Sequence, residues 1–221
     1  MSQHDYLKER YNQHIIKNNY SKIDDENAKE ASETLILILK DLFPEHNFEL
    51  KSYLYFSEIE KYTERNFNLN YNYANRKLAP DGGIIWMDKK YPILISEMKR
   101  QGTNNERVAE GKNKQAVGNA IERLGKNLIG FKTLYEKEDI LPFVCFCWGC
   151  DVTDGTFLGK LYTLNSFYEI NVIYNKNENI INKPFTCITK ESGPFTREEL
   201  LNTMLKIAIN SIKYFEKKEG K

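Results

Sequence analysis

The chain has 221 residues, of which 41% are hydrophobic and 13% aromatic, enough for one domain with a sizeable core. Its 32 Lys and Arg nearly balance its 31 Asp and Glu, so a nucleic-acid interface would have to gather positive charge on one face. No run of 18 apolar residues exists and the start is polar. We therefore expect neither a membrane span nor a secretory signal, and a cytoplasmic protein.

The N-terminal part of the chain is expected to be largely helical. The polar stretch to Asn27 predicts a flexible arm or a short helix. Residues 28–43 carry apolar side chains at helical spacing, and Pro44 ends this helix. Residues 48–56 then predict a strand, and the Asn- and Tyr-rich residues 66–76 a loop.

A β-hairpin is expected next, because two apolar runs, 83–87 and 91–96, flank a charged turn. Residues 101–112 are polar without periodicity and predict a loop, and 113–135 carry the apolar stripe of a long helix. The almost continuously apolar residues 141–148 fit a strand that is buried on both faces.

The last third predicts a strand with its turn at 160–173, a loop at 175–182 and a final helix at 196–215. Thr196 and Glu199 form a capping box for that helix. The order of elements predicts an α/β fold with a mixed central β-sheet flanked by helices. Without an internal repeat or a glycine-rich linker, the whole chain is expected to be a single domain.

Three of the four cysteines, Cys145, Cys147 and Cys150, crowd one short segment, and the fourth is Cys187. A zinc site needs further ligands at usable spacing, whereas all three histidines lie at or before His46. Because the segment alternates like a strand, we predict free buried thiols.

An acidic pattern surrounds the predicted hairpin. Asp81 precedes its first strand, and Glu97 and Lys99 share one face at the end of the second, so antiparallel pairing makes them neighbours. Two carboxylates at one place favour a cation between them, and Mg²⁺ prefers such oxygen ligands. A lysine beside the metal can orient the water that attacks a phosphodiester. The alternative is that Asp81 opens a turn and that Glu97 and Lys99 form a solvated ion pair.

The helix that follows carries Asn119, Glu122 and Arg123 close together on its polar side. Its early turns carry a positive partial charge, which suits a phosphate. Asn, Glu and Arg are side chains that read base edges in the major groove. The alternative is an ordinary solvated helix face, which composition alone favours.

Three segments together resemble the EcoRI family of type II restriction endonucleases, within the wider PD-(D/E)xK nuclease fold. They are PDGGI at 80–84, EMKRQG at 97–102 and GNAIER at 118–123. The resemblance covers about residues 80–146, roughly a third of the chain, and GNAIER is its most specific part. It implies a restriction-endonuclease-like fold for the mixed sheet.

The resemblance also implies roles for single residues. Asp81 and Glu97, helped by the backbone carbonyl of Met98, would bind Mg²⁺, and Lys99 would position the attacking water. The residues matching those that contact the inner AATT bases are Asn119, Ala120, Glu122 and Arg123. Those matching DNA-backbone positions are Arg100, Lys126 and Asn127.

The family further implies a homodimer that cuts duplex DNA at a palindrome and leaves 5′ overhangs with 5′-phosphates. It implies a cognate DNA methyltransferase in the same system. The segments before Tyr53 and after Asp151 show no resemblance, and the outer base pair is read partly from such segments. A GAATTC-like, CAATTG-like, degenerate or bare AATT site therefore remains open.

Two other functions are compatible with parts of the pattern. A structure-specific repair or junction nuclease needs the acidic hairpin but not the base-reading helix. A catalytically inactive DNA-binding module would be expected to lack a carboxylate or the lysine, yet Asp81, Glu97 and Lys99 are all present. For DNA binding, we expect basic residues to gather around a cleft while Asp24, Asp25, Glu26 and Glu136 face away; the basic residues are Lys99, Arg100, Arg107, Lys112, Lys114, Arg123 and Lys126.

Overall fold

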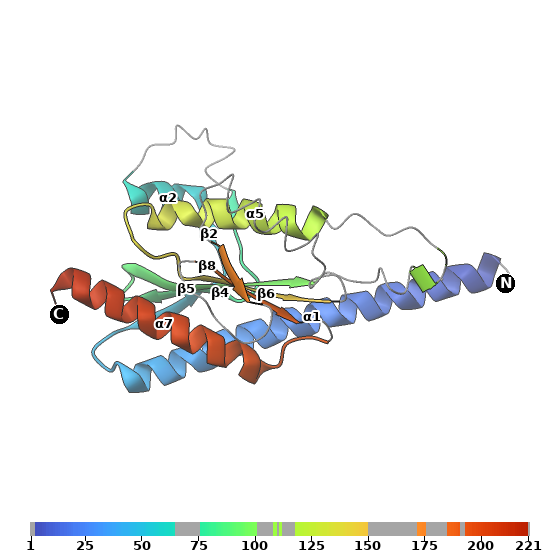
Figure 1. Cartoon of the computed structure of the whole chain (residues 1–221), viewed down its shortest axis with the longest axis horizontal. Helices are drawn as coiled ribbons and strands as arrows, with labels where there is room; N and C mark the ends of the chain where they lie inside the picture. Colours follow the sequence, from blue (N-terminus) through green and yellow to red (C-terminus); the bar gives the residue numbers. More distant parts are fainter. Residues whose placement is uncertain are drawn as a thin grey trace.

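A six-stranded sheet lies between two layers of helices in this computed structural model (Figure 1). Helices α1 (Gln3–Leu42) and α7 (Arg197–Glu219) cover one face, and α2 (Phe56–Thr63) and α5 (Gly118–Lys132) cover the other. The structure describes residues 3–64, 76–100, 108–109, 111, 118–149, 172–175, 185–190 and 193–220, and side chains at 22–64, 76–100, 108–109, 111, 124–149, 186–190 and 193–220.

The sheet has the order β1-β4-β5-β6-β8-β7 and mixes both kinds of pairing. Its antiparallel part consists of β1 (Phe48–Lys51), β4 (Gly83–Met87) and β5 (Tyr91–Arg100). Its parallel part joins β5 to β6 (Phe143–Trp148), β8 (Phe185–Lys190) and β7 (Val172–Asn175). This arrangement confirms the predicted α/β class with a mixed, helix-flanked sheet.

Helix α1 is longer than predicted. It begins at Gln3, so the expected helix over 28–43 continues through the N-terminal stretch for which an arm or a short helix was predicted. No glycine or proline interrupts residues 3–42, which lets the helical backbone continue. Within the predicted part, Ala31, Leu35 and Leu39 are buried at helical spacing and join the core.

The predicted strand over 48–56 is divided into two short strands, and its last residue belongs to a helix instead. Strand β1 ends at Lys51, and after a short break β2 (Leu54–Tyr55) pairs with β3 (Lys77–Leu78) in a separate two-stranded sheet. Helix α2 then starts at Phe56, where the Glu58 carboxylate accepts a hydrogen bond from the Tyr55 backbone N–H at 2.8 Å. This local cap satisfies a helix-terminal donor, which explains why the chain turns from strand to helix.

The later helices and strands follow the predictions more closely. The described part of the predicted 113–135 helix consists of α5 and the short 3-10 turn η1 (Thr133–Tyr135), and α7 begins with the predicted Thr196–Glu199 capping box. All six residues of β6 are buried, as expected for a strand covered on both faces. Strand β8 was not predicted. The expected loops at 66–76, 101–112 and 175–182 and the strand at 160–173 lie almost entirely outside the described residues.

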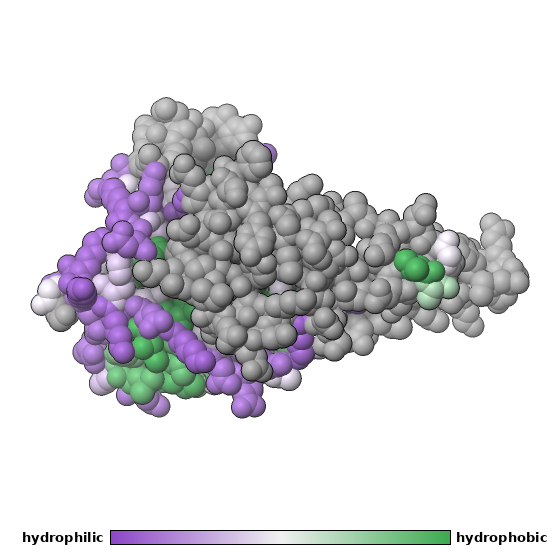
Figure 2. Space-filling model, in the orientation of Figure 1, coloured by the Kyte–Doolittle hydropathy of each residue, from purple (hydrophilic) through white to green (hydrophobic). Residues whose placement is uncertain are grey.

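The surface view shows hydrophobic residues gathered over α7 and the end of α1 (Figure 2). The exposed hydrophobic residues of the second half of α1 include Leu37 and Leu42, with 63% and 53% of their surface exposed. Among the described residues, no helix combines the length and the apolar character needed to span a lipid bilayer.

Candidate active site

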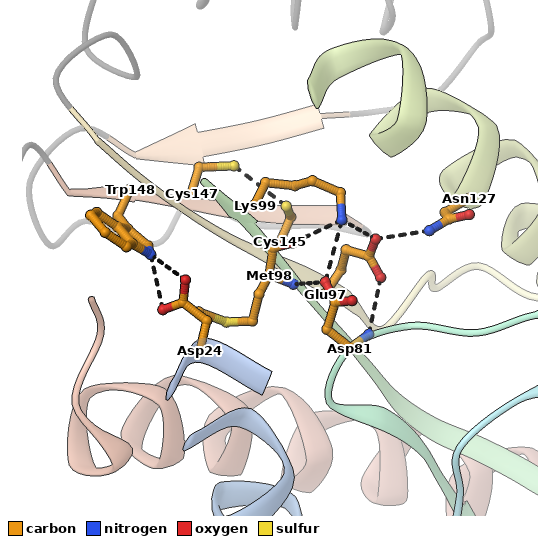
Figure 3. A network of polar contacts seen from close by, with 9 residues as sticks. All are labelled: Asp24, Asp81, Glu97, Met98, Lys99, Asn127, Cys145, Cys147 and Trp148. Atoms are coloured by element: carbon orange, nitrogen blue, oxygen red, sulfur yellow. Dashed lines mark hydrogen bonds and ion pairs between the residues drawn. The ribbon is translucent and has the colours of Figure 1, made fainter. Parts of the chain in front are cut away.

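The start of β4 and the end of β5 bring the predicted acidic residues together (Figure 3). Gly83 pairs with Ser96 in the antiparallel register, which places Asp81 beside Glu97. The Asp81 backbone N–H donates to Glu97 Oε2 at 3.3 Å, and the Met98 backbone N–H donates to Asp81 Oδ2 at 2.9 Å. The expected convergence of Asp81, Glu97 and Lys99 is therefore present in the structure.

Two glycines hold Asp81 in this position. A Cβ at Gly82 would lie 2.1 Å from Ser96 Oγ, so only glycine lets the turn approach β5 this closely. Gly83 has a φ of +80°, in the left-handed region that favours glycine. The Ser32 hydroxyl of α1 donates to the Gly82 carbonyl at 2.6 Å and fixes the turn from the other side.

Lys99 points into the centre of this cluster. Its Nζ donates to Asp81 Oδ2 at 3.3 Å, to the Met98 carbonyl at 2.8 Å and to Glu97 Oε1. These groups are the ones expected to bind Mg²⁺. Three oxygen atoms already converge on one positive group, the Lys99 ammonium. Oxygen ligands arranged in this way suit a hard divalent ion, so the residues present fit Mg²⁺.

The charges of Asp81, Glu97 and Lys99 influence the protonation of Glu97 and Lys99. Glu97 is 1% exposed, and burial raises its pKa above the usual range of a glutamate, with Lys99 opposing and Asp81 adding to the rise. Burial would lower the pKa of Lys99, but the nearby carboxylates of Glu97 and Asp81 outweigh it and raise that pKa. Lys99 is thus held as an ammonium between two carboxylates.

Asn127 reaches this site from α5. Its Nδ2 donates to Glu97 Oε1 at 2.8 Å, so its side chain contacts a carboxylate of the site although the sequence suggested a DNA-backbone position. Lys126 next to it is exposed. Arg100 lies with its guanidinium 4.8 Å from the centre of the Trp148 ring.

The expected base-reading residues fall in the first turns of α5. Asn119, Ala120, Glu122 and Arg123 belong to the described helix backbone, but their side chains lie outside the described part of the structure. Of the basic residues expected around the cleft, Arg107, Lys112 and Lys114 also lie outside it.

Helix α1 carries Asp24 and Asp25, two of the acidic residues that the sequence predicted to face away from the cleft. Asp24 is 4% exposed, and both of its carboxylate oxygens accept from Trp148 Nε1, at 3.0 and 2.9 Å (Figure 3). Burial raises the pKa of Asp24 to about 6, and burial together with the charge of Asp81 raises the pKa of Asp25. Asp24 does not take the predicted outward position, because its carboxylate is buried against Trp148, whereas Asp25 is exposed. The Asp24–Trp148 contact spans 124 residues and leaves no local sequence signal.

Buried thiols lie on the same face of the sheet as Glu97 and Lys99. Cys145 and Cys147 of β6 are register partners of these two residues, and parallel register partners project to the same side. The sulfur atoms of Cys145 and Cys147 are 3.4 Å apart, and those of Cys147 and Cys187 are 3.6 Å apart. All three are free and buried, as predicted, and Cys150 lies outside the described residues.

Comparison with known proteins gives consistent results. A family model described as restriction endonuclease EcoRI matches residues 12–220. The chain is 29% identical over 149 residues to the type II restriction enzyme RsrI of Cereibacter sphaeroides, covering 60% of this chain and 53% of that protein. It is 26% identical over 145 residues to the type II restriction enzyme EcoRI of Escherichia coli, covering 59% and 52%. The chain thus spans about half the length of the curated relatives it matches.

Proposed function

Because this chain belongs to the EcoRI family of restriction endonucleases, we propose that it is a type II site-specific deoxyribonuclease. It hydrolyses duplex DNA at a short palindrome containing AATT, depends on Mg²⁺ and leaves 5′ overhangs with 5′-phosphates. The observation that carries the proposal is the group of oxygens from Asp81, Glu97 and Met98 around the Lys99 ammonium. Phosphodiester hydrolysis needs these parts, a cation site and a positive group beside it.

In this proposal Asp81, Glu97 and the Met98 carbonyl would hold Mg²⁺, and the bound ion would supply positive charge to polarise the phosphate and to activate a water molecule. Lys99 is the residue that orients the attacking water and stabilises negative charge on the phosphate. A phosphate oxygen offers its ammonium a new acceptor in place of the carboxylates. Asn127 keeps Glu97 in one orientation through its 2.8 Å hydrogen bond.

DNA recognition is assigned to the beginning of α5 and to residues near it. Asn119, Ala120, Glu122 and Arg123 contact the inner bases, because Asn, Glu and Arg match base-edge donors and acceptors in the major groove. Arg100 and Lys126 contact the DNA backbone. Lys126 is exposed and therefore accessible to a phosphate. The base contacts rest on the resemblance of GNAIER to the family, the assignment of Arg100 on that of EMKRQG, and the assignment of Lys126 on the weaker resemblance that follows GNAIER.

The active form is proposed to be a homodimer, since two-fold protein symmetry mirrors the symmetry of a palindrome. A cognate DNA methyltransferase would protect the same sites in the host, as the family implies. The outer base pairs stay open among GAATTC-like, CAATTG-like, degenerate and bare AATT sites.

The decisive experiment incubates the protein with a long natural DNA and Mg²⁺ and maps the cut ends by sequencing. Asp81→Asn serves as the inactive variant, and Asp41→Asn, which changes an exposed acid at the end of α1, serves as the matched control. We expect discrete fragments with AATT overhangs from the protein and from Asp41→Asn, and none from Asp81→Asn. Cuts without a common sequence would favour a structure-specific nuclease, and specific binding without cleavage would favour an inactive DNA-binding module.

A further inference from the structure

A second group of ligand atoms lies at the turn of the β4–β5 hairpin, at the opposite end of these strands from Asp81 and Glu97. Glu45 and His46 come from the connection between α1 and β1, and Glu216 comes from the last turns of α7. One ligand atom of each lies within 4.8 Å of the others. Segments 170 residues apart in the chain therefore converge on this place.

One nitrogen of the buried His46 ring is firmly fixed. His46 is 6% exposed, and its Nδ1 lies 2.7 Å from Asp88 Oδ2. The other oxygen of Asp88 accepts the Asn47 backbone N–H at 2.8 Å, so the carboxylate itself is held in place. A carboxylate on one ring nitrogen is the usual support of a metal-binding histidine, because it leaves the lone pair of the other nitrogen for the metal.

The second nitrogen of His46 has a different geometry. Its Nε2 lies 3.3 Å from Glu216 Oε1. Charge-assisted hydrogen bonds are shorter, about 2.7–2.9 Å. In a tetrahedral zinc site with bonds of about 2.0–2.1 Å, neighbouring ligand atoms are about 3.3–3.4 Å apart. The distance between Nε2 and Oε1 thus matches the edge of a zinc coordination tetrahedron better than a strong ion pair.

Glu45 completes the group. Its side chain is exposed, whereas His46 is buried and Glu216 is intermediate, so the cluster opens to solvent on the Glu45 side. A cation that enters from the Glu45 side would take water as its fourth ligand. One imidazole nitrogen and two carboxylates form a ligand set that suits Zn²⁺.

We propose that Glu45, His46 and Glu216 bind one Zn²⁺ ion, with Asp88 as the positioning residue of His46. The site is separate from the Asp81–Glu97 cluster and does not depend on the proposed nuclease activity. A bound ion would connect the start of β1, the hairpin turn and the end of α7. Because the unfolded chain does not hold these ligands together, Zn²⁺ would stabilise the folded state.

The test uses the full chain stripped of metal and titrated with Zn²⁺, followed by calorimetry and thermal unfolding. We expect one Zn²⁺ per chain at this site, a higher Tm, and a tetrahedral visible spectrum when Co²⁺ replaces Zn²⁺. Glu45→Gln changes an exposed ligand and should weaken Zn²⁺ binding at least tenfold without lowering the metal-free Tm. Asp88→Asn should weaken it by about 10- to 100-fold, as loss of such a supporting carboxylate usually does.

Two controls separate this site from others. Glu198→Gln, at an exposed position in the first turn of α7, should leave Zn²⁺ binding unchanged, and so should Asp81→Asn. Unaltered affinity in Glu45→Gln would overturn the proposal. So would loss of Zn²⁺ binding in Asp81→Asn, which would move the ion to the other cluster. Both Zn²⁺-binding results are obtained without any measurement of DNA cleavage, so they do not depend on the proposed nuclease activity.

Discussion

Asn127 Nδ2 donates a hydrogen bond to Glu97 Oε1 across 2.8 Å and so connects α5 to the buried carboxylate at the end of β5. The proposed base-reading residues lie about one to two turns earlier on the same helix. A displacement of α5 on DNA would therefore act directly on Glu97. In the proposed enzyme, this contact joins sequence recognition to the catalytic carboxylate.

Replacing Asn127 tests this connection. In Asn127→Asp a second carboxylate faces Glu97 and raises its pKa further, because like charges disfavour ionisation. We expect at least a tenfold lower cleavage rate and an acid limb of the pH–rate profile that moves to higher pH. Single-turnover cleavage over a pH series measures both effects. An equal loss of DNA binding and cleavage, with an unchanged pH profile, would assign Asn127 to DNA contact instead.

Lys99 gives a prediction about metal affinity. Its ammonium offsets part of the negative charge of Asp81 and Glu97 in the structure, so it competes with a divalent cation for the same oxygens. We expect Lys99→Met to bind Mn²⁺ more tightly than the unmodified protein in the absence of DNA, while cleavage falls by about 10²-fold or more. Calorimetric titration with Mn²⁺ provides the measurement. Weaker Mn²⁺ binding in Lys99→Met would show that the lysine does not compete with the metal.

The buried Asp24 carboxylate leads us to predict that the stability of the folded protein depends on pH. Burial raises its folded-state pKa from 3.8 to about 6, against the opposing effects of Trp148 and Arg100 and with contributions from Asp25 and Asp81. Its contribution to stability is therefore fully present below pH 3.8 and is lost as the pH rises through 6. Asp24→Asn keeps an acceptor for the Trp148 N–H but has no charge. We expect this variant to be more stable than the unmodified protein at pH 8, by up to roughly 3 kcal/mol, and the difference to shrink at pH 5.

Urea unfolding at the two pH values measures this difference. Asp139→Asn, which changes an exposed carboxylate, is the control and should show no such pH-dependent gain. A variant that is less stable than the unmodified protein at pH 8 would contradict the prediction, because the charged Asp24 would then be stabilising.

Gly82 gives a steric prediction. An alanine Cβ there meets Ser96 Oγ at 2.1 Å and Ser96 Cβ at 3.1 Å, so the turn must move away from β5. We expect Gly82→Ala to lose about 1–3 kcal/mol of stability, as overpacked sites do. Because Asp81 directly precedes Gly82, the cleavage rate should fall by more than the loss of folded protein alone explains. Urea unfolding and cleavage assays on the same preparation separate the two effects. The double variant Gly82→Ala, Ser96→Ala removes the contacted hydroxyl and should recover part of both losses.

The hairpin and the Asp81–Glu97–Lys99 group could be predicted because antiparallel pairing across a tight turn is local. The contacts that join distant segments could not. Strand β8 contains Thr186 and Thr189, and it becomes an interior strand of the sheet only through parallel pairing with β6 and β7. Its β-branched and aromatic residues were an available signal, but a six-residue run does not reveal its partners.

The contact between Asn127 and Glu97 shows the same limit for the site. An asparagine near a predicted DNA-contacting helix suggests a phosphate contact, whereas its actual neighbour depends on the crossing of α5 over β5. In the same way, nothing near Asp24 in the sequence indicates that α1 reaches Trp148. Residues within one hairpin were predictable, and residues that meet through packing of separate layers were not.

The Lys99 ammonium between Asp81 and Glu97 acts as a tethered counter-ion. Dissolved cations around an acidic patch exchange with the solvent and vary with its ionic strength, but a charge on the same strand cannot diffuse away. A metal ion that enters the site must therefore displace the Lys99 ammonium, which stays close to the two carboxylates. On the proposed function, DNA can accept the displaced ammonium at its phosphate, so the substrate itself would help to load the metal, and the protein without DNA would be a poor chelator.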